Sequence, residues 1–368
     1  MSGSILGDLF KISTWGESHG KGLGVIVDGC PAGLELSEED IQKDLDRRKP
    51  GQSPFTTPRK EKDKVEILSG VFEGKTTGTP ISLIIFNKNQ RSKDYSHIKE
   101  VFRPGHSDFT YDMKYGFRDY RGSGRSSGRE TAARVAAGAI AKKLLALTGV
   151  EITGYTSSIG PVSINPDNFN KDYIMNNFLY MPDKEAAEKA EVYLTNLIKE
   201  NNSSGGTIEC KVKNVPKGLG DPVFDKCDAL LARALMSIGA VKGVEIGSGF
   251  EAATMTGHEH NDFYRYNNDG EISKVTNNAG GMVGGITDGS EISLKIAIKP
   301  TPSIEKTQPT INKSGENIEI NIHGRHDPII VPRAVVVVEC MVALTLVDLL
   351  MKNMTSRVEN IKKIYGED

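Results

Sequence analysis

The segment from Ala334 to Leu350 constrains the fold more than any other part of this sequence. It is the most apolar stretch of a 368-residue chain, although Glu339, Thr345 and Asp348 interrupt it. A membrane-spanning helix needs about 20 predominantly apolar residues, so this interrupted segment is too short to cross a bilayer comfortably. We therefore expect a buried helix, opened by Pro332, in a chain long enough to enclose it in a substantial core.

The grouping of predicted strands and helices favours the α+β class. Alternating or short apolar runs bounded by turn residues predict strands at residues 24–29, 65–71, 80–86, 207–215, 291–299 and 317–323. Caps and apolar periodicity predict helices at residues 37–48, 128–147, 182–200 and 222–238, besides the apolar segment. The strands cluster instead of alternating strictly with helices, which argues against a doubly wound parallel sheet. In the absence of repeats or a recognisable linker, we expect residues 1–368 to form a single domain.

The overall charge excludes a general attraction to polyanions. Lys and Arg number 46 against 48 Asp and Glu, which leaves a net charge of -2. Such a chain has no global affinity for nucleic acid or for an anionic membrane, so any anion binding must be local. The sequence begins with MSGSILGDLF, which lacks the features of a signal peptide.

The cysteines argue against a disulfide framework and against a structural zinc site. Cys30, Cys210, Cys227 and Cys340 are far apart and form no C-x-x-C pair, which fits a reducing cytoplasm. The His258-Glu-His260 pair lies in a polar loop without a third ligand, so we assign no metal.

The stretch from Phe117 to Arg134, FRDYRGSGRSSGRETAAR, predicts a local anion site. It holds five arginines against two acids, with glycines and serines between them, and it leads into a strong helix. Guanidinium groups, close backbone approach and the start of a helix together suit a phosphate or a carboxylate. Its glycine spacing fits neither the dinucleotide fingerprint nor the P-loop. A solvated basic loop leading into a helix remains the alternative interpretation.

Three histidines lie in polar, turn-like motifs that suit proton transfer near physiological pH. They are His19 in GESHG, His106 in RPGHSD and His326, which precedes Asp327 in GRHDP. GESHG also fits the nucleophile elbow of hydrolases, with Ser18 as the nucleophile. That motif requires a helix after the serine, whereas glycines and a strand-like run follow here, so the hydrolase interpretation is weak.

Two further glycine- and proline-rich segments are candidates for a flavin site. Lys299-Pro-Thr-Pro-Ser303 ends a predicted strand, and the glycine-rich run at residues 280–285 permits close backbone approach. Each also fits ordinary turn chemistry. Together with the segment around Arg125, they make a plausible site for the phosphate and ring of a flavin.

These motifs together resemble the chorismate synthase family over nearly the whole chain. The matching stretches are GESHG at Gly16, DLDRRKPGQS at Asp44, SGVFEGKTTGTPI at Ser69, RPGHSD at Arg103, RGSGRSSGRETAARVAAGA at Arg121, SIGAVKGVEIGSGF at Ser237, NNAGGMVGG at Asn277 and GRHDP at Gly324. The resemblance implies conversion of 5-enolpyruvylshikimate 3-phosphate to chorismate by an anti-1,4-elimination of phosphate with loss of a C6 proton. It implies a requirement for reduced FMN without net redox change. It also implies a β-α-β sandwich, with two antiparallel sheets packed together and helices outside, usually assembled as a homotetramer.

The resemblance further implies a role for individual residues. His19 matches the acid that protonates the leaving phosphate, His106 the histidine beside the flavin N1 and C2 oxygen, and Asp327 the carboxylate that helps flavin N5 take the C6 proton. The matching substrate anchors are Arg48, Arg103, Arg129 and Arg325. The matching FMN positions are Arg125, Ser126, Ser127, Gly239, Ala240, Gly284, Lys299, Pro300, Thr301, Pro302, Ser303 and Arg325.

The sequence departs from the family pattern at a few positions. Pro54 stands where the family often has a basic residue associated with a nicotinamide cofactor, and Ser123 and Gly128 stand where Gly and Ala are common. We therefore expect a separate flavin reductase to supply reduced FMN, with NADPH acting only indirectly. A built-in reductase activity remains an alternative.

Two other classes of function compete with the lyase. A nucleic-acid site in the arginine-rich loop would need a wider basic surface and would lose affinity steeply with salt. A serine hydrolase would be labelled at Ser18 by a serine-directed phosphonate. We rank both below the lyase and expect a small-molecule substrate, with no nucleic acid or membrane partner.

Overall fold

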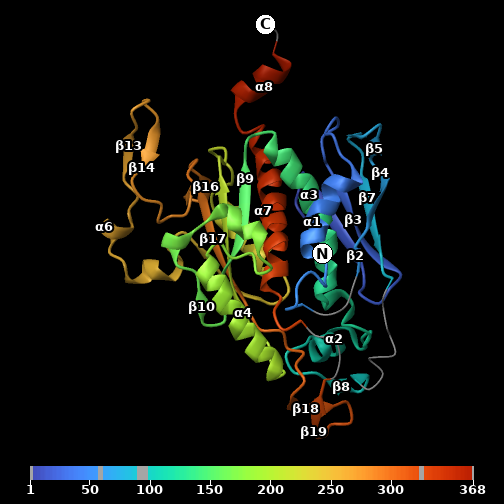
Figure 1. Ribbon diagram of the computed structural model, residues 1–368. Coiled ribbons are helices and arrows are strands. Elements are labelled where there is room, and N and C mark those ends of the chain that lie inside the picture. The colour runs from blue at the N-terminus through green and yellow to red at the C-terminus, as the bar shows by residue number, and fades with distance from the viewer. Residues whose placement is uncertain (1–2, 57–60, 89–97, 323–326, 367–368) are drawn as a thin grey trace.

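Two five-stranded antiparallel sheets form the outer layers of the fold (Figure 1). The computed structural model describes residues 3–56, 61–88, 98–322 and 327–366. The first sheet has the order β1 (Ile5–Leu6), β2 (Lys11–Gly16), β3 (Gly22–Asp28), β7 (Ile81–Phe86) and β4 (Val65–Ser69). The second has the order β10 (Val162–Ser163), β9 (Glu151–Ile159), β11 (Gly206–Lys213), β17 (Ile292–Ile298) and β12 (Val241–Ile246).

Three helices lie between the two sheets (Figure 1). They are α1 (Glu38–Arg48), α3 (Thr131–Ala146) and α7 (Val331–Asn353). Helix α3 packs on β3 and β7 with one side and on α7 with the other, and α7 packs on β9 and β11. The mixed α+β class is thus confirmed, but the expectation that the helices lie outside the packed sheets is wrong for these three.

The composition of α7 explains why helices occupy the centre. Seventeen of its 23 residues are buried, because apolar side chains cover its whole circumference. A helix that is apolar on every side must be enclosed on every side. By length and composition α7 would also suit a membrane, but 89% of its most apolar window is buried inside the protein, as expected of a core helix.

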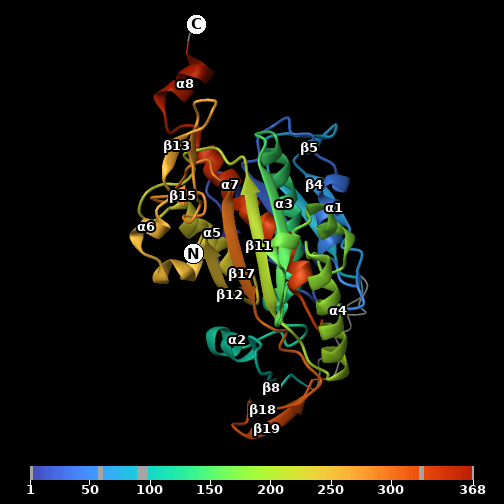
Figure 2. The ribbon, with the colours of Figure 1, turned by 60° about the vertical axis from the view of Figure 1, so that its left-hand side comes forward.

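The remaining elements extend the sandwich at its ends. Helix α5 (Cys227–Met236) packs on α7 and β12, and α4 (Lys184–Lys199) packs beside β10. Figure 2 shows α2 (Asp108–Tyr115) with the small sheet β19 (Asn317–Asn321), β18 (Thr307–Asn312) and β8 (Val101–Phe102) beyond one end of the second sheet. Helix α8 (Val358–Tyr365) projects from the opposite end (Figure 1). The other short elements are the pairs β5 (Val71–Phe72) and β6 (Lys75–Thr76), β13 (Tyr264–Tyr266) and β14 (Ile272–Lys274), β15 (Met282–Val283) and β16 (Ile286–Thr287), and α6 (Gly257–His260).

Most predicted elements are present, with corrections at some boundaries. Ser37 caps α1 through a capping box with Asp40, which confirms the predicted start. The predicted Ser127–Glu130 box instead opens a short 3₁₀ turn, because the Glu130 carboxylate accepts from Arg134 Nε at 2.9 Å and α3 begins at Thr131. The helix predicted over residues 222–238 occupies only α5, and the long strand β9 was not predicted.

The two acidic residues that interrupt α7 each bind another part of the protein, whereas the Thr345 hydroxyl donates to the Met341 carbonyl in the same helix. Glu339 accepts from Arg47 Nη1 at 2.6 Å, from Lys142 Nζ at 3.1 Å and from the Gly154 N–H at 3.0 Å. It therefore joins α7 to α1, α3 and β9. Asp348 accepts from three consecutive backbone N–H groups, those at residues 8–10, at 2.7 to 3.0 Å. These contacts satisfy charges that would be costly to bury alone.

Gly138 marks the closest approach of α3 to α7, and replacing it tests the packing between the layers. A Cβ added there would lie 2.2 Å from the Cys340 Cβ and 2.7 Å from its Cα. Alanine is intrinsically a better helix former than glycine by about 1 kcal/mol. We nevertheless expect Gly138→Ala to lower the free energy of unfolding by about 1 kcal/mol or more, since overpacking outweighs propensity.

Chemical denaturation monitored by circular dichroism measures this change. Gly257→Ala is the matched control, because a Cβ at Gly257 meets nothing within 4 Å. A Gly138→Ala protein more stable than the parent would contradict the close packing of α3 on α7.

Candidate active site

Most candidate residues lie on loops at the end of the sandwich near α2 and β8 (Figure 2). These loops are the β2–β3 turn with GESHG, the segment from Arg103 to Glu130 and the segment that follows β17. The residues come from distant parts of the sequence, yet hydrogen bonds connect most of them into one cluster.

Two of the predicted substrate anchors share one buried carboxylate. Asp63 Oδ2 accepts from Arg48 Nη1 and Asp63 Oδ1 accepts from Arg129 Nη1, both at 2.6 Å. Arg48, Asp63 and Arg129 are 3%, 2% and 7% exposed. Burial raises the pKa of the Asp63 carboxyl, but the charges of Arg48 and Arg129 outweigh that effect and hold the pKa below its ordinary value. The three groups therefore form a buried cationic cluster with one net positive charge.

Arg48 and Arg129 differ in how fully the protein satisfies them. Arg48 also donates from Nε to the Thr131 hydroxyl at 3.1 Å and from Nη2 to the Gly128 carbonyl at 3.1 Å. Arg129 donates from Nε to Asn87 Oδ1 at 2.5 Å, whereas its buried Nη2 has no hydrogen-bond partner among the described residues. An anionic oxygen would satisfy this buried donor.

The turn that holds His19 packs against the arginine-rich loop. Asn87 donates to the carbonyls of Glu17 and Gly20 at 3.0 and 2.9 Å, so it holds both sides of the Ser18-His19 pair. Ser18 donates to the Gly122 carbonyl at 2.8 Å. Gly122 has φ +63°, and a Cβ there would lie 2.2 Å from the imidazole of His19. Ser18 therefore joins two loops instead of being presented as a nucleophile, and glycine is required opposite His19.

Arg103 is held in the same cluster by Asp108. The guanidinium of Arg103 donates to both Asp108 oxygens, at 2.7 and 2.9 Å, and to the Ser123 hydroxyl at 2.8 Å. Arg118 Nη1 lies 3.2 Å from Asp108 as well. A second buried carboxylate thus lies between two arginines, and it connects Arg103 to the loop next to His19.

His106 is held between a carbonyl and a hydroxyl. Its Nδ1 lies 2.9 Å from the Pro104 carbonyl and its Nε2 lies 2.9 Å from the Ser303 hydroxyl. A carbonyl only accepts, so Nδ1 carries the proton and Nε2 of the neutral ring accepts from Ser303. Burial, with repulsion from Arg103, lowers the pKa of His106 to about 4. The ring is therefore neutral at pH 7 in the protein without a ligand.

The Lys299–Ser303 segment brings donors next to His106. Lys299 Nζ donates to the Gly105 carbonyl at 3.0 Å, and the Lys299 N–H donates to the Ala240 carbonyl at 2.9 Å. The Thr301 hydroxyl is buried without a partner among the described residues. A Cβ added at Gly239 would meet nothing within 4 Å, so space remains open beside this segment.

Asp327 joins the cluster through an arginine that the sequence did not identify. Arg333 Nη1 donates to Asp327 Oδ2 at 2.8 Å, and Arg333 Nε donates to the Arg48 carbonyl at 3.0 Å. Asp327 is thereby linked to the end of α1, where Arg48 lies. Its predicted neighbour Arg325 lies outside the described residues, as does His326.

The other predicted cofactor residues have mixed locations. Arg125 donates to the Thr14 hydroxyl at 2.7 Å and the Gly16 carbonyl at 3.2 Å, while the Ser127 hydroxyl accepts from the Arg129 N–H. Ser126 donates to the Ser123 carbonyl at 2.7 Å. These side chains fix the loop next to GESHG.

Within a single chain, Gly284 lies away from the hydrogen-bonded cluster of candidate residues. Its turn is tied to the first residue of α5, because the Cys227 N–H donates to the Gly285 carbonyl at 2.8 Å. Gly239 follows the opposite end of the same helix. Ten residues of helix span about 15 Å, so Gly284 and Gly239 lie well apart.

Three residues that sequence reasoning missed complete the cluster: Asp63, Asn87 and Arg333. Asp63 lies in the charged run EKDK, which is typical of an exposed loop, and only its contacts with distant arginines make it buried. The sequence held one indirect signal for Asp63. The predicted helix at residues 37–48 ends in arginines, and an acidic residue in the charged run that follows it could serve as their counter-ion.

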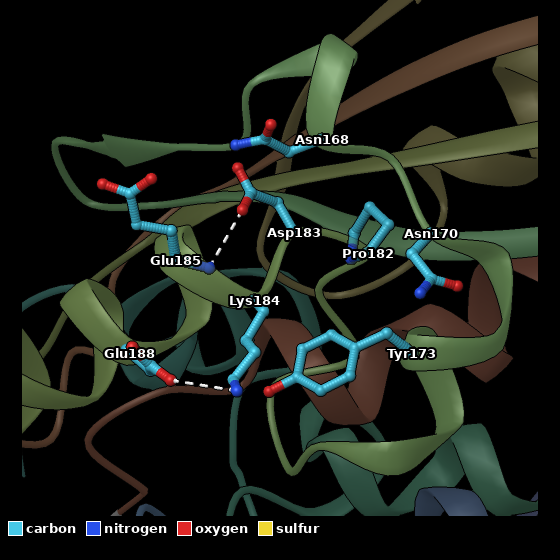
Figure 3. A pocket seen from close by; sticks show the side chains of 8 residues that line it. All are labelled: Asn168, Asn170, Tyr173, Pro182, Asp183, Lys184, Glu185 and Glu188. Atoms are coloured by element: carbon cyan, nitrogen blue, oxygen red, sulfur yellow. Dashed lines mark hydrogen bonds and ion pairs between the residues drawn. The ribbon is translucent and has the colours of Figure 1, made fainter.

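A separate cavity of about 470 Å³ lies beside the first turn of α4 (Figure 3). It is lined by Asn168, Asn170, Tyr173, Pro182, Asp183, Lys184, Glu185 and Glu188. Its central carboxylate, Asp183, already accepts from the N–H groups of Asn165, Glu185 and Ala186. The cavity holds none of the candidate residues. Among the described residues, no group of three His, Cys, Asp or Glu is arranged to hold a metal ion.

Comparison with known proteins gives one consistent result. The family model described as chorismate synthase matches residues 10–351. The chorismate synthase of Agathobacter rectalis is 65% identical over 365 residues, covering 99% of each chain. That of Methanocaldococcus jannaschii is 56% identical over 362 residues, covering 94% of this chain and 96% of its own. A crystal structure of a chorismate synthase superposes with a TM-score of 0.76 at 35% identity, covering 97% of this chain and 96% of that one.

The titration of His106 tests the geometry of its loop. We expect an NMR midpoint near 4 without ligands, with the resonance assigned by its loss in His106→Gln. Because the unfolded chain binds this proton at about pH 6.5 and the folded chain does not, the free energy of unfolding should fall as the pH drops from about 6.5 to 4. His106→Gln should flatten that slope. A midpoint near 6.5 would be inconsistent with a buried ring beside Arg103.

Proposed function

The chain belongs to the chorismate synthase family, and from this we propose that it converts 5-enolpyruvylshikimate 3-phosphate to chorismate by an anti-1,4-elimination of phosphate, with reduced FMN as cofactor. Family membership makes the chain a lyase of chorismate biosynthesis. The identity of the cofactor and the role of each residue are the proposed parts.

The unpaired Nη2 of Arg129 is the observation that carries the proposal. It lies in a buried cluster where arginines outnumber carboxylates, and it lacks a partner among the described residues. A substrate with one phosphate and two carboxylates would supply the missing acceptor. Arg48, which shares Asp63 with Arg129, and Arg103, which is paired with Asp108, are proposed as further anchors, together with Arg325. Such a cluster binds an anion locally even though the net charge of the chain is -2.

His19 is proposed as the acid that protonates the departing phosphate. Asn87 links its turn to Arg129, so an anion on Arg129 would lie near the imidazole. Proton donation and cationic stabilisation at one leaving group act together on the transition state. Asp327, held by Arg333, is proposed to assist removal of the C6 proton.

The residues around His106 fit a flavin. Three features suit a phosphate or carbonyl-rich ligand: the buried Thr301 hydroxyl, which has no partner within the described part of the chain, the Lys299 ammonium group and the open space beside Gly239. When bound, reduced flavin supplies the transient electron density that imidazoles and carboxylates lack. We assign this ligand to Arg125, Ser126, Ser127, Gly239, Ala240, Lys299, Pro300, Thr301, Pro302, Ser303 and Arg325. Gly284, which is separate from these residues in a single chain, would contribute from a second copy of the chain in the proposed homotetramer. His106 would lie at the ring, where its Nε2 can gain a proton as an anionic ligand raises its pKa.

The setting of the reaction is part of the same proposal. With Pro54 in place of a basic residue, we infer that a separate reductase supplies the reduced flavin and that NADPH acts only indirectly. We also propose a cytoplasmic homotetramer, which light scattering coupled to gel filtration would test.

Anaerobic incubation with the substrate tests the cofactor. Phosphate and chorismate should appear only when chemically reduced FMN is present, and oxidised FMN with NADPH alone should give no turnover. Product without any flavin would overturn the cofactor assignment. Turnover with oxidised FMN and NADPH would instead reveal a built-in reductase.

Paired substitutions in GESHG test the acid. His19→Ala should lower kcat by about 100-fold or more, because general acid catalysis typically contributes 10²–10⁴. Ser18→Ala should lower kcat only severalfold, since the Ser18 hydroxyl donates to Gly122. Steady-state assays with reduced FMN give both values. Equal losses in the two variants would remove His19 from its assigned role.

A further inference from the structure

Two of the three guanidinium nitrogens of Arg129 donate hydrogen bonds to side chains from different segments of the chain. Asp63 precedes β4 and accepts from Nη1 at 2.6 Å, while Asn87 follows β7 and accepts from Nε at 2.5 Å. A guanidinium is a rigid planar fork, so fixing two nitrogens fixes the direction of the third. The third nitrogen is Nη2, the buried donor without a described partner.

The local backbone supports a dedicated role for Asp63. Its φ is +45°, a conformation that few residues other than glycine, asparagine and aspartate adopt readily. Its side chain is fully buried and each carboxylate oxygen contacts a different arginine. This carboxylate sets the spacing of Arg48 and Arg129 and removes the repulsion between their charges.

Asn87 connects the same arginine to the proposed acid. Its carbonyl oxygen accepts from Arg129, and its amide nitrogen donates to the carbonyls of Glu17 and Gly20. One side chain thus sets the distance between the anion-binding guanidinium and the turn that holds His19.

We propose that Asp63 and Asn87 are positioning residues that hold Arg129 with its Nη2 directed at the substrate and in register with His19. The inference rests on the proposed function. Neither residue needs to touch the substrate, since Asp63 acts through Arg129 and Arg48, and Asn87 acts through Arg129 and the turn of His19.

Asp63→Asn and Asn87→Ala test the two contacts separately. Asn is isosteric with Asp and tolerates the positive φ, but it leaves the two guanidinium groups without a counter-charge. We expect each substitution to raise the Kd for 5-enolpyruvylshikimate 3-phosphate about tenfold, because a misplaced guanidinium loses charge-assisted hydrogen bonds. Calorimetric titration without flavin gives this Kd.

Steady-state kinetics with reduced FMN separate the role of holding Arg129 from the role of holding the turn of His19. Asp63→Asn should raise KM about tenfold and lower kcat less than Asn87→Ala does, since it displaces the guanidinium but leaves the turn of His19 held. Asn87→Ala should raise KM and also lower kcat, because it releases the turn of His19. Glu151→Gln is the control, since Glu151 also pairs with a cation, Lys171, but at an exposed position outside the cluster. It should leave Kd and KM unchanged.

A double-mutant cycle distinguishes positioning from general loss of structure. In an Arg129→Ala background, Asn87→Ala should change Kd by less than about twofold, because coupled residues are not additive. Asp63→Asn should there keep only the part of its effect that passes through Arg48, its other partner. Effects of full size in that background would overturn the inference. If Asp63→Asn does not fold, as circular dichroism would show, the Asn87→Ala arm of the cycle decides. A parent protein that binds no substrate would instead overturn the proposed function together with the inference.

Discussion

The buried carboxylate of Glu339 is the interaction on which the rest of the structure depends. It lies in the middle of α7 and receives Arg47 from α1, Lys142 from α3 and a backbone N–H from β9. Burial raises the pKa of this carboxyl, but Lys142 and Arg47 outweigh that effect and hold the pKa below its ordinary value. Removing one partner of such a pair typically costs 3–5 kcal/mol. The contact also orients the site, because Arg48 follows Arg47 on the same helix and is turned by about 100° toward Asp63.

The site shows how a chain with a net negative charge can hold positive charge locally. Asp63 and Asp108 each lie between two arginines, so each group of three side chains keeps one net positive charge. The carboxylates are as necessary as the cations, since neighbouring guanidinium groups repel each other in a buried setting. Net charge therefore says little about a site that is assembled from local pairs.

Features set by neighbouring residues could be predicted from the sequence, and features set by distant contacts could not. The cap at Ser37 and the burial of α7 were predicted because local pattern determines them. Apolar periodicity shows that a helix face is buried but not what covers it. The expectation of sheets packed together with helices outside came from the family resemblance, and it is wrong for α1, α3 and α7. Asp63 was missed because its partner Arg129 lies 66 residues away. The family resemblance was confirmed, since it draws on motifs from the whole chain.

The contact between Asp348 and the turn between β1 and β2 has a consequence for how the chain folds during synthesis. Its carboxylate accepts from the N–H groups of residues 8–10, which are separated from it by about 340 positions. Residues 8–10 are therefore synthesised long before α7, the helix whose Asp348 satisfies their N–H groups. Chains with such distant contacts fold slowly and expose unpaired edges meanwhile. A nascent chain that stops before α7 therefore lacks both the most buried helix of the central layer and the carboxylate that holds residues 8–10.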